Sequence, residues 1–327
     1  MLTASYNQDI GTVRDVKIRR LRSVEPQSLP QVNAISGIGL EGDMHADPLS
    51  PRQVLLASTS AYESFDLNPN SLRENLLLDA DVSRLKSGGV LCIGSSVALW
   101  LMFQCEACGH LNVQKADLSK VIGNQRGMLS RVLRGGEIRP GDRVRYFELL
   151  MPSWSLDWRD RIRMILSSMP SGQVVEYKQL ARIAGVPSGY CRVFPRVLKE
   201  MGTGYSSKAV SVRSQSTRPR WLGSELFNVS TNFIDGVSEI RSTPHHVTPH
   251  LENKMQKEDN TYAQVKHQMT KSLSDSGRTE DALNFGAVNV LLTKGRSLKN
   301  DTAQNFNPKP YPEVSDALPS DYDSWLS

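Results

Sequence analysis

The sequence predicts a multidomain chain in which a mainly β domain precedes a small α-helical domain and a largely irregular tail. Three observations predict this order. Short strand-like runs separated by turn residues fill residues 1–150, apolar residues recur at helical spacing in residues 151–234, and this periodicity fades over residues 235–327. The 327 residues are enough for two domains of ordinary size. We therefore expect domain boundaries near residues 150 and 234.

The strand-like runs of the first domain are bounded by Gly, Pro, Asn or Ser. The clearest runs cover residues 11–18, 53–57, 90–93 and 143–147. Such punctuation is typical of a β-sheet or a β-barrel. Cys92 lies inside one of the apolar runs, so we expect it to be an inert core residue.

The second domain shows helical periodicity after Pro152. Apolar spacing predicts helices over residues 158–169, 178–184 and 190–201, and a glycine-containing turn separates the last two. Two helices joined by a tight turn in a basic segment indicate a helix-turn-helix or winged-helix-like domain. An ordinary small helical subdomain is the alternative interpretation.

The formal charge of +5 is unevenly distributed along the chain. Residues 151–235 contain twelve Lys and Arg against six Asp and Glu, a net charge of +6, whereas the residues before them total +1 and those after them −2. Such asymmetry favours an acidic partner for the basic segment, most commonly nucleic acid. A solvated basic face without a partner is the alternative.

Several patterns indicate a cytoplasmic protein without a membrane partner. The longest apolar run, residues 97–103, is too short to cross a bilayer. The N-terminus lacks the apolar stretch of a secretory signal, and four unevenly spaced cysteines do not form a disulfide framework. The tail is rich in Pro, Asn, Ser, Thr, Lys and Asp, a composition that favours low order.

Cys105 and Cys108 are the one close pair of cysteines in the chain. A thiolate can carry a sulfur atom or ligate a soft metal, which makes Cys108 a candidate catalytic residue and a candidate metal ligand. Cys105 could resolve a persulfide on Cys108 or form a reversible disulfide with it. Structural zinc is a weaker interpretation, because such sites usually have four ligands.

Five short motifs follow one another as in the MOSC domain, which occurs at the C-terminus of molybdenum cofactor sulfurases and in free-standing bacterial proteins. They occupy residues 39–45, 73–76, 107–111, 126–127 and 135–144. This resemblance covers residues 10–148 and implies a β-barrel-like fold that handles sulfur or the molybdenum cofactor. It places the reactive cysteine of the family at Cys108, with Ala107 where the family has proline.

The resemblance also gives roles to polar residues of the motifs. The cofactor-binding candidates are Asp43, His45, Arg73, Glu74, Asn75 and Arg126. The two arginines and the histidine are candidates to stabilise a thiolate or to hold an anionic pterin phosphate. The carboxylates and the amide could orient the histidine or hydrogen-bond the pterin. A turn at Asp43, a purely structural His45 and a loop cap by Asn75 are the alternatives.

The function expected from this resemblance is that of a sulfur-carrier or molybdenum cofactor-binding protein, which passes sulfur through a persulfide on Cys108. Complete cofactor sulfurases also have an aminotransferase-like domain that binds pyridoxal phosphate, and no motif for that cofactor is visible in this sequence. We therefore expect a separate sulfur donor, such as a cysteine desulfurase, as the partner of a candidate sulfurtransferase.

Residues 158–198 resemble the DNA-binding half of O6-alkylguanine-DNA alkyltransferases and alkyltransferase-like proteins. The resemblance implies that Tyr177 lies beside the target phosphate and that Arg192 enters the base stack when a base is flipped. The stretch that corresponds to the acceptor motif, residues 205–213, contains no cysteine, so the chain is not an active alkyltransferase. The alternative function is therefore that of a non-enzymatic DNA-lesion-binding protein.

Overall fold

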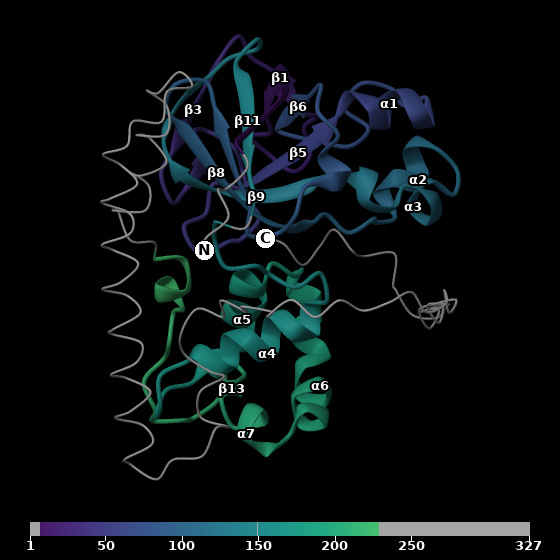
Figure 1. The fold of residues 1–327 in the computed structure, drawn as a ribbon. Helices are drawn as coiled ribbons and strands as arrows, with labels where there is room; N and C mark the ends of the chain where they lie inside the picture. The colour runs from purple at the N-terminus through teal and green to yellow at the C-terminus, as the bar shows by residue number, and fades with distance from the viewer. Residues whose placement is uncertain (1–6, 149, 229–327) are drawn as a thin grey trace, which may run out of the picture. The chain divides into compact units, whose positions relative to one another are not determined.

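The structure is a computed structural model that describes residues 7–148 and 150–228 (Figure 1). The prediction of an irregular tail over residues 235–327 and the boundary near residue 234 lie outside the described residues. Within the described part of the chain, no helix has the length and apolar character needed to span a membrane.

The main sheet of the described residues closes into a β-barrel. Its strand order is β11-β7-β8-β9-β5-β6-β1-β2, and β11 also pairs with β1, so that the strands from β11 to β1 form a closed ring. The strands are β1 (Asn7–Ile18), β2 (Gln27–Ser28), β5 (Val54–Ser58), β6 (Leu76–Leu78), β7 (Val90–Ile93), β8 (Val97–Gln104), β9 (Met128–Arg134) and β11 (Arg143–Phe147). The barrel-like fold is therefore confirmed, and so are the four strand-like runs of the sequence, which match β1, β5, β7 and β11.

A second, three-stranded sheet extends one side of the barrel domain. It has the order β10-β3-β4 and consists of β10 (Gly136–Ile138), β3 (Val32–Ile35) and β4 (Gly39–Leu40). The pairing of β3 with β10 joins residues that are about a hundred positions apart in the chain.

Strands β7 and β8 are buried on both faces. Alternate side chains point into the barrel, where Leu91, Leu99 and Leu101 join the interior core. The intervening side chains, Cys92, Trp100 and Met102, join a different core on the outer face. Burial of both faces explains the uninterrupted apolar run at residues 97–103, because a strand with one solvated face would alternate with polar residues.

Three short helices gather at one end of the barrel (Figure 1). They are α1 (Thr59–Phe65), α2 (His110–Gln114) and α3 (Leu118–Val121), and the 3₁₀ helices η1 (Val82–Arg84) and η2 (Gly123–Arg126) belong to the same domain. Ala61, Leu111 and Leu118 share a small core of their own. This core also contains Ile122, which directly precedes η2, whereas Cys105 is part of the core on the outer face of the barrel.

The segment after residue 150 is mainly helical, as expected. It contains α4 (Trp158–Ser168), β12 (Val175–Glu176), α5 (Tyr177–Ala184), η3 (Ser188–Arg192), α6 (Phe194–Met201), α7 (Thr203–Ser206), β13 (Ala209–Val210) and η4 (Ser224–Phe227). The third predicted helix is divided into η3 and α6. Pro195 lies at the start of α6, where a proline fits a helix N-terminus but cannot continue the preceding helix.

A winged-helix domain is not shown by these elements. The two short strands of the segment, β12 and β13, pair in parallel. A wing built as a β-hairpin would require antiparallel strands. The helices themselves are confirmed, and the helix-turn-helix interpretation stays a prediction.

The helical segment packs on the outer face of the barrel. Ile162, Leu180 and Ile183 share one continuous core with Trp100 and Met102 of β8. At the far end of the segment, Phe227 of η4 returns to the barrel, where the guanidinium of Arg131 lies 3.7 Å from the centre of its ring. Residues before and after residue 150 are therefore buried in the same apolar core.

Candidate active site

Asp43 organises the loop of the first motif. Its side chain is buried and accepts hydrogen bonds at 2.8 to 3.0 Å from the backbone amides of Arg19 and His45, from the ring Nδ1 of His45 and from the side-chain amide of Asn75. Burial by itself would raise the pKa of Asp43, but the hydrogen bonds from His45 and the backbone outweigh it, so the pKa is lowered. Asp43 is therefore held as a carboxylate.

Glu74 and Asn75 brace the strands of the barrel. Glu74 is fully buried, pairs with Lys17 at 2.6 Å and accepts a hydrogen bond of 2.6 Å from the hydroxyl of Tyr62. Burial and the charge of Glu74 raise the pKa of Tyr62, which keeps its proton for this bond. Asn75 accepts a hydrogen bond from the backbone amide of Leu55 and donates to the carbonyl of Lys17, so it joins β1 to β5. The polar atoms of both residues are thus engaged within the protein.

Four basic side chains from distant parts of the sequence form what we call the basic cluster. Arg19 follows β1, Arg73 precedes β6, His110 begins α2 and Arg126 ends η2. Each of them has a buried nitrogen without a hydrogen-bond partner, namely Arg19 Nη1, Arg73 Nε, His110 Nε2 and Arg126 Nε. Buried donors are nearly always satisfied in folded proteins, so four together call for an acceptor that the protein itself does not supply.

The members of the basic cluster act on one another electrostatically. Burial, followed by the charges of Arg73 and Arg126, lowers the pKa of His110. Burial, followed by the charge of Arg73, also lowers the pKa of Arg19. The charged arginines of the cluster therefore lie close enough to disfavour one another and the protonated form of His110, and a bound anion would relieve this repulsion.

Existing contacts hold the cluster arginines in place. Arg126 Nη1 donates to the carbonyl of Leu72 at 2.8 Å. A guanidinium nitrogen of Arg73 lies 3.7 Å from a carboxylate oxygen of Glu25. The backbone of Arg73 has a φ of +51°, a left-handed conformation that is uncommon outside glycine and that is often found at functional sites.

The two cysteines of the close pair differ in exposure. Cys108 is exposed, and its carbonyl accepts the backbone amide of Leu111 at 3.0 Å in the first turn of α2. Cys105 is only 6% exposed and accepts a contact of 3.7 Å from Arg52 Nη2. Both thiols are free. Within the described ranges, no group of three or more His, Cys, Asp or Glu side chains is arranged to hold a metal ion.

The structure brings only some of the predicted site residues together. Arg73 and Arg126 both belong to the basic cluster, and their charges lower the pKa of His110. His110 is two residues from Cys108 in the sequence. His45 is about half exposed and forms its hydrogen bonds with Asp43. The sequence interpretation gave no role to His110, although His110 lies inside the motif at residues 107–111.

Arg19 was also missed by sequence reasoning. It lies in a basic stretch directly after β1, and nothing local distinguishes it from Arg20 and Arg22. Its backbone amide is bound by Asp43, which fixes the strand end from which the Arg19 side chain extends. A search for basic residues at strand ends would have selected Arg19 and Arg20 alike.

The two predicted DNA contacts lie on separate elements of the helical segment. Tyr177 begins α5 and is half-buried, with its ring centre 6.0 Å from that of Phe194. Burial raises the pKa of Tyr177. Arg192 ends η3 and is exposed. Their contact with DNA stays a prediction, as does the resemblance of residues 158–198 to alkyltransferases.

Comparison with known proteins relates the barrel to one family. A scan against protein families matches residues 45–145 to the MOSC domain. A search of curated proteins found no significant match. Among solved structures, the YuaD protein of Bacillus subtilis is 16% identical, with a TM-score of 0.40, over 44% of this chain and 99% of that one.

Two further solved structures are YiiM proteins. That of Geobacillus stearothermophilus is 15% identical, with a TM-score of 0.35, over 59% of this chain and 100% of that one. That of Escherichia coli is 14% identical, with a TM-score of 0.34, over 64% of this chain and 99% of that one. These likenesses are too distant to carry an argument about chemistry. The family match, together with the closed barrel, identifies residues 45–145 as a MOSC domain.

Proposed function

We propose that the MOSC domain of this chain binds the molybdenum cofactor, with the phosphate of the cofactor on the basic cluster and the thiolate of Cys108 toward the metal. The observation that carries the proposal is the set of four buried nitrogens without partners on Arg19, Arg73, His110 and Arg126. Three of them, on Arg73, His110 and Arg126, lie within the residues that match the MOSC domain, a family associated with this cofactor.

The residues of the site suit such a ligand chemically. Guanidinium groups bind phosphate through charge-assisted and often bidentate hydrogen bonds. Cys108 supplies a soft ligand, and its exposed position leaves it open to a bound metal. When bound, the cofactor would supply a redox-active metal centre, while the basic cluster would hold its anionic end.

A sulfur-carrier role for Cys108 is the finer part of the proposal. In that role the thiolate of Cys108 attacks the terminal sulfur of a persulfide on a donor such as a cysteine desulfurase. The sulfur–sulfur bond of the donor breaks, a new one forms on Cys108, and the donor leaves as a thiolate, so no external oxidant or reductant is needed. The exposure of Cys108 supports this role, because the donor persulfide must reach it.

The cofactor proposal is tested by purifying the protein without oxygen from a cofactor-producing host and measuring molybdenum and pterin per chain. We expect both in the wild-type protein and a clear reduction in Arg73→Gln, because this variant removes a phosphate contact. Arg84→Gln is the matched control, since Arg84 is a strongly exposed arginine that pairs with Asp81 elsewhere on the barrel. Equal content in Arg73→Gln and the control contradicts the assignment of the basic cluster.

The sulfur-carrier role has a separate test. Incubation with a cysteine desulfurase and cysteine, followed by intact mass measurement, should add one sulfur atom to the wild-type protein and none to Cys108→Ser. Cys191→Ser is the control, because Cys191 lies in the helical segment. An adduct that persists in Cys108→Ser excludes Cys108 as the carrier.

DNA binding through residues 151–234 is the second candidate function. It is supported by the exposed basic side chains of Lys178, Arg192 and Lys199 on α5, η3 and α6. A gel shift with alkylated-guanine DNA and matched undamaged DNA, at two salt concentrations, tests it. Binding that ignores the lesion and is lost with modest salt indicates only a general polyanion surface.

A further inference from the structure

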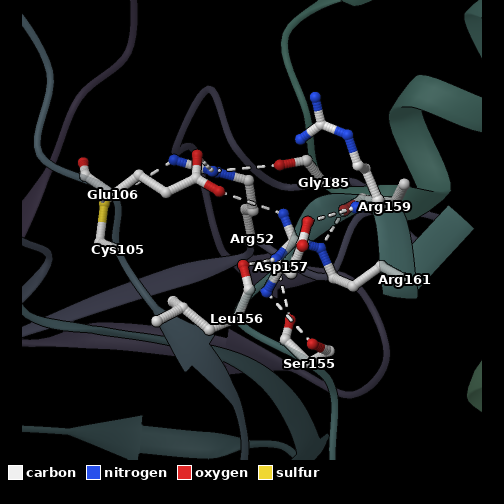
Figure 2. A network of polar contacts seen from close by, with 10 residues as sticks. Arg52, Cys105, Glu106, Ser155, Leu156, Asp157, Arg159, Arg161 and Gly185 are labelled. Carbon is white, nitrogen blue, oxygen red and sulfur yellow. Dashed lines mark hydrogen bonds and ion pairs between the residues drawn. The ribbon is translucent and has the colours of Figure 1, made fainter. Parts of the chain in front are cut away.

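Glu106, which lies between the two cysteines, is held by arginines from two different parts of the chain (Figure 2). Its carboxylate lies 3.3 Å from Arg161 Nη2 and 3.9 Å from Arg52 Nη1. Arg161 belongs to α4 of the helical segment, whereas Arg52 precedes β5 of the barrel. We call residues 105–108 the cysteine loop.

Arg161 has a fixed geometry. It is completely buried, with its guanidinium carbon 3.8 Å from the centre of the Phe103 ring. Its Nε donates to the carbonyl of Ala184, and its Nη1 donates to the carbonyls of Ser155 and Leu156, each at 2.9 Å. The remaining nitrogen, Nη2, is directed at Glu106 (Figure 2). A guanidinium fixed by several bonds can in turn fix the carboxylate that it contacts.

Arg52 also contacts the cysteine loop. Its Nη1 donates to the carbonyl of Gly185 at 3.1 Å, and its Nη2 lies 3.7 Å from the sulfur of Cys105. The guanidinium thus joins the end of α5 to the cysteine loop (Figure 2). The helical segment therefore reaches the loop directly through Arg161 and indirectly through Arg52.

We propose that Arg161 is a positioning residue, which holds the cysteine loop through Glu106 and thereby fixes the position of Cys108. The inference rests on the proposed function of Cys108. It gives the helical segment a role in the MOSC site, although Arg161 lies outside the residues that match the family. The Glu106 side chain is 38% exposed, so it can be altered without opening the core.

The test measures alkylation of each cysteine by iodoacetamide in the native, full-length protein, with peptide mass spectrometry. The variants are Glu106→Gln, which keeps the size of the side chain but removes its charge, and Arg161→Lys. The matched control is Asp160→Asn, which removes an exposed ion pair with Arg163 on the same helix. Thermal unfolding is followed in parallel.

We expect Cys105 to react slowly in the wild-type protein and faster by about fivefold in Glu106→Gln, because a charge-assisted hydrogen bond to the loop is lost. Cys191 should react at an unchanged rate, and Asp160→Asn should behave as wild type. Unchanged alkylation of Cys105 in Glu106→Gln overturns the proposal, even if Arg161→Lys does not fold.

The molybdenum content of the same proteins separates this inference from the function on which it rests. Glu106→Gln should hold less molybdenum than Asp160→Asn. Faster alkylation of Cys105 with wild-type molybdenum content overturns the positioning role, because loop order would not then matter to the site. If the wild-type protein holds no cofactor, the proposed function fails, and the alkylation rates still decide whether Arg161 holds the loop.

Discussion

At the scale of single residues, Asp43 is the side chain on which the geometry of the first motif depends. It accepts hydrogen bonds from Arg19, His45 and Asn75 while it is buried. Through these bonds it connects the end of β1 to the residue that precedes β6. A buried carboxylate with this many donors keeps its charge, which explains why its pKa is lowered in spite of burial.

Replacement of Asp43 by Asn should destabilise the protein by about 2 kcal/mol, because the amide nitrogen would face donors that need an acceptor. The pH dependence has a definite sign. Since the folded-state pKa of Asp43 lies below its usual value, the carboxylate contributes stability above the unfolded-state pKa, and this contribution is lost as the pH falls through the folded-state value. Urea unfolding at several pH values should show a shallower loss of stability toward acid in Asp43→Asn than in wild type.

The pKa values of Asp47 and Asp79 are also lowered by hydrogen bonds that outweigh burial, so some acid dependence should remain in the Asp43 variant. If the free energy of unfolding falls with acid pH as steeply in Asp43→Asn as in the wild-type protein, the role assigned to Asp43 is contradicted.

At the scale of elements, the end of α5 shows how closely the helical segment fits the barrel. Gly185 ends the helix with a φ of +67°, and a Cβ atom there would lie 2.7 Å from Pro51 Cγ and 2.9 Å from Phe103 Cζ. Only glycine combines the left-handed backbone with this close approach at little strain. The helix end is therefore specified both by its own backbone and by the barrel surface.

Gly185→Ala should lower the free energy of unfolding by about 2 kcal/mol, through backbone strain and overpacking. Gly189→Ala is the matched control, because a Cβ at Gly189 would meet no atom within 4 Å. Chemical denaturation of both variants provides the comparison. Equal stability of the two variants would contradict the close packing of Gly185 against Pro51 and Phe103.

The sequence predicted individual elements better than their association. Strands β1, β5, β7 and β11 follow from alternation and turn residues, and α4 follows from helical spacing. The closure of β11 onto β1 depends on pairing between the two ends of the domain, which no local pattern encodes. The apolar run at residues 97–103 did contain a signal for a covered outer face, but the sequence does not tell what covers it.

The site residues stay predictions. Short motifs select Arg73 and Arg126, which the structure brings together in the basic cluster, and also Cys108, whose role is untested. They could not separate residues that face a ligand from residues that brace the fold, and Glu74 and Asn75 are already bonded to barrel neighbours. Arg161 could not be recognised, since its relation to Glu106 depends on a tertiary contact across more than fifty residues.

At the scale of the whole described structure, one apolar core serves both the barrel and the helices. Trp100 and Met102 on the outer face of β8 are covered together with Ile162 and Ile165 of α4. Removal of the helices would expose this face to water, and exposed apolar patches of this kind promote association.

A chain truncated after residue 150 should therefore bind a hydrophobic dye such as ANS and elute as larger species in size-exclusion chromatography. The full-length protein should bind no dye under the same conditions. On denaturation, its β-sheet and helix should be lost together in one transition when followed by circular dichroism. A monomeric, dye-free truncated chain contradicts the shared core.

The proposed function places the molybdenum cofactor at the helix-bearing end of the MOSC barrel, between the basic cluster and Cys108. The most direct test is anomalous diffraction at the molybdenum absorption edge, from crystals of protein purified without oxygen. We expect an anomalous peak within bonding distance of the Cys108 sulfur, with phosphate density in contact with Arg73 and Arg126. A molybdenum peak elsewhere in the molecule, or cofactor density away from the basic cluster, would contradict it.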